Sequence, residues 1–320
     1  MRIFHHSFDP KIAATAVAVG NFDGLHRGHQ FILDLLVKEA RDRQLYSLVY
    51  TFYPHPQKLL RGKAPEQLMT LSARLRGISD WDIDGVVIRK FDERIAKMKA
   101  EEFVAEEVVG RLKARLLLVG ETHALGRGRG GTPKKLAQMG KAMGLEVLVV
   151  PVLQCCGMDI SSTELRRVIS TGDLSLAQEF LGKPFSLAGR VTGGYGRGYE
   201  ELGIPTANLA IPLNVISPRG VFVARCRGSF GERLAVVNIG SCPTFGNQDR
   251  SVEVHLIDFA GDLYGERLKL ELLAKLREEK DFGSIDELRR QIKRDIIMAQ
   301  ELFPAGSISI GQSSGKWHQE

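Results

Sequence analysis

Apolar runs rich in β-forming residues alternate with helical patterns through the first 182 residues of the chain. Successive strands separated by helices point to crossover connections, which produce a parallel sheet with helices packed on its faces. The predicted strands cover residues 15–19, 45–52, 85–88, 115–119 and 146–152, and the predicted helices cover residues 29–41, 71–79, 100–111, 133–143 and 173–181. We therefore expect a Rossmann-like α/β domain over residues 1–182.

Near residue 183 the apolar pattern changes from a helical period to strict alternation, which predicts a second domain. A chain of 320 residues is also long for one hydrophobic core. Short strands separated by glycine-rich turns favour an antiparallel β-barrel over residues 183–304 with a C-terminal helix. The predicted barrel strands are 186–191, 221–226, 233–239, 252–258 and 268–273, and the helix covers 284–302. Residues 305–320 are rich in glycine and serine and are expected to be a disordered tail.

Composition narrows the class of protein. The chain is 43% hydrophobic and 26% charged, as in ordinary globular proteins, and no apolar run is long enough to cross a bilayer. The first residues lack the apolar core of a signal peptide, so we expect a cytoplasmic protein without a membrane partner. The four cysteines fit no zinc spacing, and the vicinal pair Cys155-Cys156 has poor disulfide geometry, so reduced thiols are expected.

The net charge of +6 is compatible with nucleic-acid binding, but the basic residues are interspersed with acidic ones. Positive potential also attracts polyphosphate ligands. We favour small-molecule phosphate ligands over nucleic acid, and nothing in the sequence indicates an obligate protein partner.

The segment Gly20-Asn-Phe-Asp-Gly-Leu-His-Arg-Gly-His-Gln30 follows a predicted strand and precedes a predicted helix. Backbone N–H groups and the positive end of a helix then converge on one place, which suits phosphate. His26 and His29 are three residues apart at the helix start, and Gly28 between them would let a ligand approach the backbone.

A second candidate phosphate seat is Ile160-Ser-Ser-Thr-Glu-Leu-Arg166. A serine or threonine at a helix start is also an ordinary N-cap, so a purely structural role is the alternative. Three consecutive hydroxyls followed by Arg166 exceed what a cap needs, because the arginine fork binds phosphate oxygens in pairs.

The second half of the chain carries a glycine loop over residues 193–198, followed by Thr206 and Asn208. A hydroxyl and an amide oxygen are hard ligands suited to Mg²⁺ that carries a nucleotide. Glu253 and His255 alternate in a predicted strand, so both side chains should face the same way. We expect Glu253 on the inward face, where a carboxylate is costly unless it is paired or used in chemistry.

These motifs resemble known families. His26-Arg-Gly-His29 resembles the His-x-Gly-His signature of nucleotidyltransferases, and its longer context is similar to the adenylyltransferase half of bacterial FAD synthetases. The run ending at Arg166 resembles a phosphate-binding motif of the same enzymes. Residues 197–208 resemble the riboflavin kinase motif Arg-Gly-x-x-x-Leu-Gly-x-Pro-Thr-Ala-Asn. The resemblance covers residues 14–303, which is nearly the whole chain.

The resemblance implies a bifunctional enzyme that phosphorylates riboflavin to FMN and then adenylylates FMN to FAD with a second ATP, releasing pyrophosphate. It implies catalytic roles for His26, His29, Arg166 and, as the base in the kinase half, Glu253. The implied nucleotide-binding residues are Gly20, Asn21, Phe22, Asp23, Gly28, Ser161, Ser162, Thr163, Arg197 and Gly198. The implied flavin-binding residues are Arg277, Phe282, His123 and Arg127, and the implied Mg²⁺ ligands are Thr206 and Asn208.

One segment departs from the family pattern. Between residues 120 and 131 the family usually has Gly-x-Asp-Phe-x-Phe-Gly-x-x-Arg, but this chain has Thr122, His123 and Leu125 in place of the aspartate and the two aromatic residues. Two alternatives therefore remain open. One is a riboflavin kinase with a weakened or inactive adenylyltransferase domain, and the other is a non-catalytic flavin- or nucleic-acid-binding regulator on the same scaffold.

Overall fold

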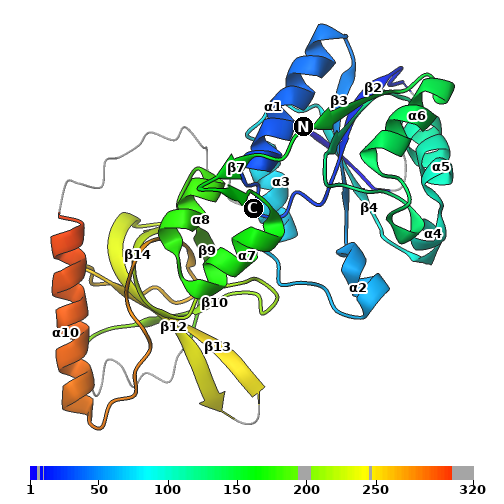
Figure 1. Cartoon of the computed structure of the whole chain (residues 1–320). Coiled ribbons are helices and arrows are strands. Elements are labelled where there is room, and N and C mark those ends of the chain that lie inside the picture. Colours follow the sequence, from blue (N-terminus) through cyan, green and yellow to red (C-terminus); the bar gives the residue numbers. More distant parts are fainter. Residues whose placement is uncertain (6–7, 10, 194–202, 245–246, 305–320) are drawn as a thin grey trace. The chain divides into compact units, whose positions relative to one another are not determined.

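The computed structural model describes residues 1–5, 8–9, 11–193, 203–244 and 247–304 (Figure 1). The chain divides into two compact units. The first contains Met1–Ser170, Ser175–Lys183 and Asn214–Ile216, and the second contains Thr171–Leu174, Pro184–Leu213 and the chain from Ser217. The predicted tail over residues 305–320, Arg197 and Gly198 lie outside the described residues.

A six-stranded parallel sheet forms the centre of the first unit and confirms the predicted Rossmann-like class. Its strand order is β1-β4-β3-β2-β5-β6, and every neighbouring pair is parallel. The strands are β1 (Arg2–Phe4), β2 (Thr15–Val19), β3 (Tyr46–Phe52), β4 (Gly85–Arg89), β5 (Ala114–Gly120) and β6 (Glu146–Val150). The strand order reverses between β2 and β5, and the carboxyl ends at such a reversal form the usual ligand crevice of open α/β sheets.

Helices cover both faces of this sheet (Figure 1). The helices and short elements are α1 (Arg27–Asp42), α2 (Pro56–Arg61), α3 (Leu71–Ile78), α4 (Glu93–Lys97), α5 (Ala100–Phe103), the π-helix η1 (Val104–Arg111), the 3-10 helix η2 (Arg127–Arg129), α6 (Pro133–Met143), α7 (Ser162–Thr171), α8 (Leu174–Leu181), and the two-stranded hairpin β7 (Gln154–Cys155) and β8 (Met158–Asp159). Ala16 and Ala18 of β2 pack in one core with Leu33 of α1, whereas Val17 and Val19 pack in the other core with helices of the opposite face. All five residues of β2 are buried, as expected for a central parallel strand.

Residues 100–111 were predicted as one α-helix, but the helix continues as a π-helix from Val104. The buried side chain of Glu107 lies in this π-helical segment. It accepts hydrogen bonds from Tyr50 Oη at 3.2 Å, Arg89 Nη2 at 3.0 Å and Arg111 Nη1 at 2.8 Å. These contacts join η1 to two neighbouring strands, so the carboxylate is paired as a buried charge must be.

The second unit contains a closed six-stranded barrel with the strand order β10-β13-β12-β11-β14-β9, which confirms the predicted antiparallel barrel. The strands are β9 (Ser186–Thr192), β10 (Ala207–Ala210), β11 (Gly220–Gly228), β12 (Gly231–Thr244), β13 (Asn247–Leu256) and β14 (Arg267–Arg277). β10 was not predicted, because it has only four residues and Pro205 lies two positions before its start.

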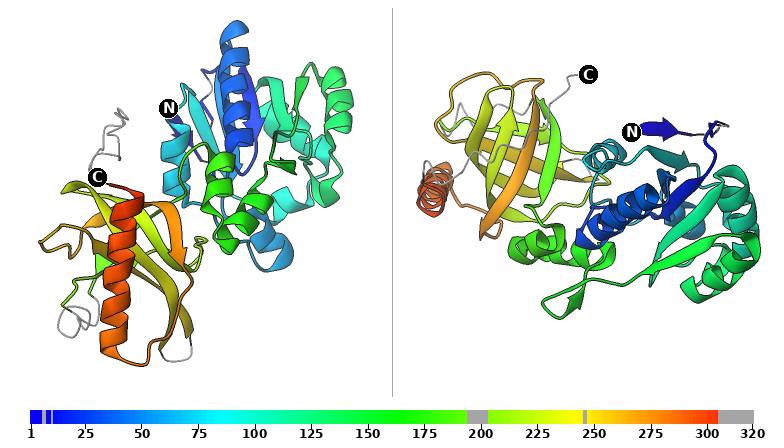
Figure 2. Two further views of the ribbon diagram at one scale, coloured as in Figure 1. Left: turned by 60° about the vertical axis from the view of Figure 1, so that its left-hand side comes forward. Right: turned by 90° about the horizontal axis from the view of Figure 1, so that it is seen from above.

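Helix α10 (Ile285–Leu302) packs on the outer face of the barrel (Figure 2). Ala299 of α10 lies in one apolar cluster with Val221, Val223 and Val236. The alternate residues of β11, such as Phe222, are fully buried and face the barrel interior. Alternate residues of β11 therefore line the interior of the barrel, and the residues between them form its outer face.

Replacing Glu107 with alanine tests the buried charge network. The change leaves the guanidinium groups of Arg89 and Arg111 without their shared carboxylate, so the free energy of unfolding should fall by about 3 kcal/mol or more. Urea unfolding followed by circular dichroism measures the loss. The neighbouring residue is the control, because within the described residues Glu106 pairs with Arg94 alone and both of these side chains are more than half exposed. Glu106→Ala should change stability by less than about 1 kcal/mol, and equal losses in both variants would contradict the assignment.

Candidate functional site

Polar side chains gather where three adjacent strands of the parallel sheet end. The turn containing Asn21 and His26 follows β2, His55 follows the neighbouring strand β3, and His123 follows β5 on the other side of β2. Because parallel strands present their carboxyl ends at one edge, these groups share the crevice at the strand-order reversal.

The imidazoles of His26 and His29 stack with ring centroids 3.7 Å apart and an interplanar angle of 20°. His26 is the N-cap of α1, and its Nδ1 accepts a hydrogen bond from the backbone N–H of His29 at 3.4 Å. A Cβ atom at Gly28 would lie 3.2 Å from His26 Nδ1, so a side chain there would press on the stacked ring. The ring of Phe22 supports His29 from a centroid distance of 5.2 Å.

Both histidines are neutral at pH 7. Burial is the main cause and the Arg166 charge a smaller one, and together they lower the pKa of His26 to about 4. Burial also lowers the pKa of His29 well below its ordinary value, followed by the effects of His26 and Arg74. Among the described residues, the buried atoms Asn21 Oδ1, His29 Nδ1 and His123 Nε2 have no hydrogen-bond partner. Buried polar atoms are rarely unpaired, so this crevice has hydrogen-bonding capacity available for a ligand.

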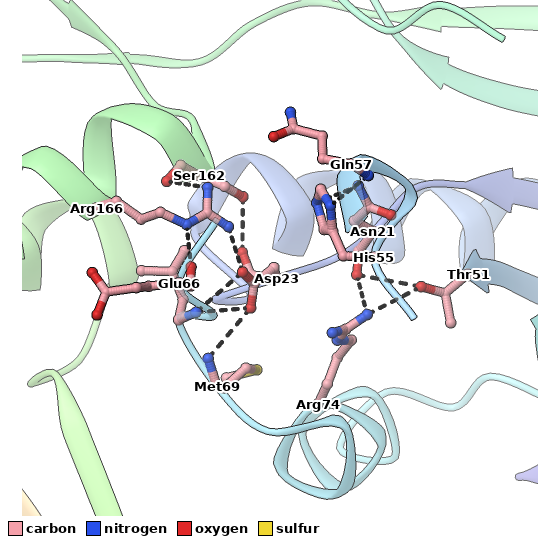
Figure 3. Close-up of polar contacts among 11 residues, drawn as sticks. Asn21, Asp23, Thr51, His55, Gln57, Glu66, Met69, Arg74, Ser162 and Arg166 are labelled. Atoms are coloured by element: carbon pink, nitrogen blue, oxygen red, sulfur yellow. Dashed lines mark hydrogen bonds and ion pairs between the residues drawn. The ribbon is translucent and has the colours of Figure 1, made fainter. Parts of the chain in front are cut away.

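Asp23 and Arg166 connect the two predicted phosphate seats (Figure 3). Arg166 Nη2 lies 2.5 Å from Asp23 Oδ2, and Asp23 also accepts hydrogen bonds from the backbone N–H groups of Leu68 and Met69. Arg166 Nε donates to the carbonyl of Glu66 at 2.6 Å. The guanidinium group is therefore held at the crevice by contacts from two separate segments.

The residues at the start of α7 cap their own helix and also contact the turn after β2, which is the first predicted phosphate seat. Ser161 Oγ accepts a hydrogen bond from Glu164 N at 3.2 Å, as an N-cap does, and its contact with phosphate stays a prediction. Ser162 Oγ donates instead to the carbonyl of Asp23 at 2.9 Å. Thr163 is exposed in the first turn.

Arg74 was missed by the sequence reasoning. This buried arginine of α3 donates from Nη1 to the carbonyl of Asn21 at 2.7 Å and lies 3.3 Å from Thr51 Oγ1 (Figure 3). Burial lowers the pKa of its guanidinium, although Asp23 opposes this effect. His55 also belongs here, since its Nε2 lies 3.2 Å from Asn21 Nδ2. No motif marks Arg74 in the sequence, because only folding brings α3 beneath the ends of β2 and β3.

The residues that depart from the family pattern lie in two environments, the crevice at the strand ends and the hydrophobic core. Burial lowers the pKa of His123 to about 4, with a smaller effect of Arg129. Leu125 is buried in the core cluster of one sheet face and is hydrogen-bonded through its backbone to Gly131. Arg127 is exposed on η2. His123 is thus the departing residue that presents an unpartnered polar atom.

In the barrel, strand register aligns three polar residues across β10, β13 and β12. Asn208 and Asn238 are both paired with Glu253, and Ser251 Oγ donates to Glu253 Oε1 at 3.4 Å. The predicted inward orientation of Glu253 is wrong. Its neighbours Val252 and Val254 are the buried, inward residues of β13, so Glu253 lies on the outer face of the barrel.

A cavity of about 480 Å³ lies beside this row and includes Thr206 and Asn208 in its lining, together with Thr192, Asp262 and Tyr264. The two predicted metal ligands therefore share one cavity, and Asn208 also borders Glu253 through the strand register. His255 Nδ1 lies 2.8 Å from the carbonyl oxygen of Pro205 and fixes the start of β10.

Arg277 and Phe282 are in contact at the other predicted flavin position. The Arg277 guanidinium lies 5.6 Å from the centroid of the Phe282 ring, within the range of a cation–π contact. Arg277 Nη2 and Nε donate to Asp295 of α10 at 2.9 and 3.1 Å, and Asp295 is buried. The arginine is positioned by the C-terminal helix.

Both halves of the chain match family models. Residues 9–164 match FAD synthetase and residues 181–303 match riboflavin kinase. A bifunctional riboflavin kinase/FMN adenylyltransferase of Escherichia coli (strain K12) is 37% identical over 90% of this chain and 92% of its own length. The chain belongs to the bifunctional riboflavin kinase/FMN adenylyltransferase family. The resemblance seen in the sequence motifs is confirmed.

Other similar proteins also cover almost the whole chain. The bifunctional riboflavin kinase/FMN adenylyltransferase of Haemophilus influenzae is 33% identical over 93% of this chain and 97% of its own length. A crystal structure described as a macrolide-efflux protein from Streptococcus pneumoniae has a TM-score of 0.84 and 28% identity, and it covers 94% of this chain and 99% of that one. Among the described residues of the present chain, no helix has the length and apolar character needed to cross a membrane.

The buried histidine of this family member predicts a pH dependence of stability. In the unfolded chain His26 takes up a proton near pH 6.5, whereas in the folded chain it does so only near pH 4. The free energy of unfolding should therefore fall as the pH drops from 6.5 to 4, and His26 should account for on the order of 3 kcal/mol of that loss. Urea unfolding at pH 7 and pH 4.5 measures it.

The informative variant is His26→Asn, because asparagine keeps the N-cap but does not titrate. It should lose less stability on acidification than the unmodified chain. His5→Asn, at an exposed histidine, should leave the loss unchanged. An unchanged loss in His26→Asn would show that His26 is not the group responsible.

Proposed function

We propose that this chain makes FAD from riboflavin in two steps, with one step in each of two domains divided near residues 182 and 183. The barrel transfers the γ-phosphate of ATP to a ribityl hydroxyl of riboflavin and forms FMN. In the α/β domain the FMN phosphate then attacks the α-phosphate of a second ATP, which gives FAD and pyrophosphate. Family membership over both halves supports this reading, and the single structural observation that carries it is a separate polar site in each unit. Both steps use small-molecule substrates alone.

In the α/β domain we assign the nucleotide to the turn of Gly20, Asn21, Phe22, Asp23 and Gly28. The stacked imidazoles of His26 and His29 are neutral, so each offers an N–H donor to oxygens of the attacked α-phosphate, where negative charge develops. Such donors, fixed before the reaction, stabilise the transition state more than mobile water does.

Arg166 completes the phosphate site from the opposite side. Its ion pair with Asp23 holds the guanidinium beside the histidine turn, and we assign it with Ser161, Ser162 and Thr163 to the triphosphate. The buried Asp23 is then a positioning residue rather than a ligand of the phosphates. On the flavin side we assign His123, which has an unpartnered nitrogen, and the exposed Arg127.

In the barrel we assign Glu253 as the base that takes the proton from the ribityl hydroxyl. Thr206 and Asn208 fit a Mg²⁺ ion, because both residues line one cavity and each carries a side-chain oxygen. When bound, the ion would neutralise phosphate charge and orient the ATP. Arg277 and Phe282 would border the flavin, with the aromatic ring of Phe282 supplying a flat apolar surface.

A second candidate is a riboflavin kinase with weakened adenylylation. It is favoured by His123, which replaces an aromatic side chain where the family contacts the flavin. One assay separates the two candidates, namely incubation with riboflavin, ATP and Mg²⁺ followed by separation of riboflavin, FMN and FAD. FAD as a product supports the bifunctional enzyme, whereas accumulation of FMN alone supports the second candidate.

Glu253→Gln tests the kinase base. Glutamine keeps the size of the side chain but cannot accept the proton, so FMN formation should fall by roughly a hundred- to ten-thousand-fold. Conversion of supplied FMN to FAD should be unchanged. The matched control is Glu232→Gln, which removes another carboxylate on the outer face of the barrel, where Glu232 pairs with Arg225 and Arg227. Kinase rates that are equal in the two variants would remove Glu253 from the mechanism.

His29→Ala tests the adenylyl site, and here FAD formation rather than FMN formation should be lost. The variant loses a donor to the α-phosphate that is worth about 3 kcal/mol in the transition state, so FAD formation should fall by roughly a hundred-fold or more. Riboflavin phosphorylation should continue and FMN should accumulate, which makes Glu253→Gln and His29→Ala controls for each other. Normal FAD formation in His29→Ala would leave His29 with only a structural role.

A further inference from the structure

A tight hairpin immediately before α7 carries the vicinal pair Cys155-Cys156. Gln154 pairs with Asp159 and Cys155 with Met158, so the turn consists of Cys156 and Gly157. Both turn residues have positive φ, +53° at Cys156 and +74° at Gly157, as a two-residue type I′ turn requires. This short loop has little freedom to separate the two cysteines.

The two thiol sulfurs lie together on the surface. Their Sγ atoms are 3.5 Å apart, Cys156 is exposed and Cys155 is partly exposed. Successive side chains of an extended strand point to opposite faces, so adjacent cysteines ordinarily hold their sulfurs apart. The left-handed backbone at Cys156 removes that alternation at this turn.

This geometry is poor for a disulfide and for zinc. A disulfide needs the sulfurs at about 2.0 Å and Cα atoms at least about 4.4 Å apart, whereas adjacent Cα atoms are fixed at about 3.8 Å. Structural zinc needs four ligands. Over the described ranges, no group of three or more histidine, cysteine, aspartate or glutamate residues could hold a metal ion. What fits is one atom that bridges two sulfurs and needs no third protein ligand.

We propose that Cys155 and Cys156 form a chelating site for trivalent arsenic. An organic arsenical R–As=O reacts with the two thiols to form two As–S bonds, and the oxygen leaves as water with both thiol protons. Arsenic stays trivalent, keeps its organic group as the third substituent, and no oxidant or reductant is consumed. Arsenic(III) is soft and thiophilic, which matches a pair of sulfur ligands.

The chemistry of the pair agrees with chelation rather than with single-thiol reactivity. The hydrogen bond with Cys156 raises the pKa of the Cys155 thiol, and burial adds to the effect. Cys155 is therefore a poor thiolate nucleophile near pH 7. Condensation with R–As=O starts from thiols and gains its strength from closing a ring through both sulfurs.

The site is coupled to the adenylyl half through the chain, and this coupling rests on the proposed function. The backbone N–H of Ile160 donates to Leu153 at 2.8 Å and closes the hairpin, and Ser161 then caps α7. A bridging atom at the hairpin should alter how this start of α7 is held. We expect bound arsenical to slow conversion of FMN to FAD and to leave riboflavin phosphorylation unchanged.

The test uses the reduced full-length chain and phenylarsine oxide. Intact-mass measurement should find one adduct per chain that survives excess 2-mercaptoethanol and is removed by 2,3-dimercaptopropanol. Cys155→Ser and Cys156→Ser should each weaken binding by roughly a hundred-fold or more, because the second bond is no longer intramolecular. Cys226→Ser and Cys242→Ser should retain the adduct, and Cys226 is buried.

An adduct that persists at full strength in Cys156→Ser, or that 2-mercaptoethanol removes from the unmodified chain, overturns the site. Circular dichroism spectra and urea transitions that match those of the unmodified chain show that both hairpin variants fold. Binding with unchanged FAD formation overturns the coupling to α7. A chain that makes no FAD before arsenical is added refutes the adenylyl function instead, and the mass measurement still decides the arsenic site.

Discussion

The ion pair between Asp23 and Arg166 is the contact on which the proposed adenylyl site depends. It joins two segments separated by 143 positions in the chain and places both predicted phosphate seats at one edge of the sheet. A buried carboxylate is stable only when its charge and lone pairs are satisfied. Asp23 meets this condition with Arg166 and with the backbone N–H groups of Leu68 and Met69. The loop before α3 is thereby fixed by the same carboxylate.

Burial sets the electrostatics of this crevice. Neutral histidines can be packed ring against ring, whereas two imidazolium ions at that separation would repel one another. The positive charge is carried by the arginines, which keep their protons even when burial lowers the pKa, as it does at Arg74. The site thus combines fixed cations with neutral hydrogen-bond donors, and both favour an anionic ligand.

The barrel builds its polar row by a different device. Register across three antiparallel strands places Asn208, Glu253 and Asn238 side by side, while the alternate residues fill the interior. Strand register therefore brings the polar side chains together in the barrel, whereas a buried ion pair does so in the α/β unit. The sequence carried a signal against the inward orientation predicted for Glu253, because Val252, Val254 and Leu256 are the apolar residues of β13 and the apolar face of a strand turns to the core.

Local patterns in the sequence determined much of this protein. Apolar periodicity predicted the parallel sheet, the barrel and α10, because hydrogen-bonded elements bury one face at their own repeat. The His26-Arg-Gly-His29 motif indicated the first phosphate seat, because three-residue spacing at a helix start is a local property. Only the tertiary structure decided the π-helical turn around Glu107, the four-residue strand β10 and the place of Arg74 beside Asn21. Each of these depends on contacts between segments distant in the chain, and their free energy exists only once the chain has closed on itself.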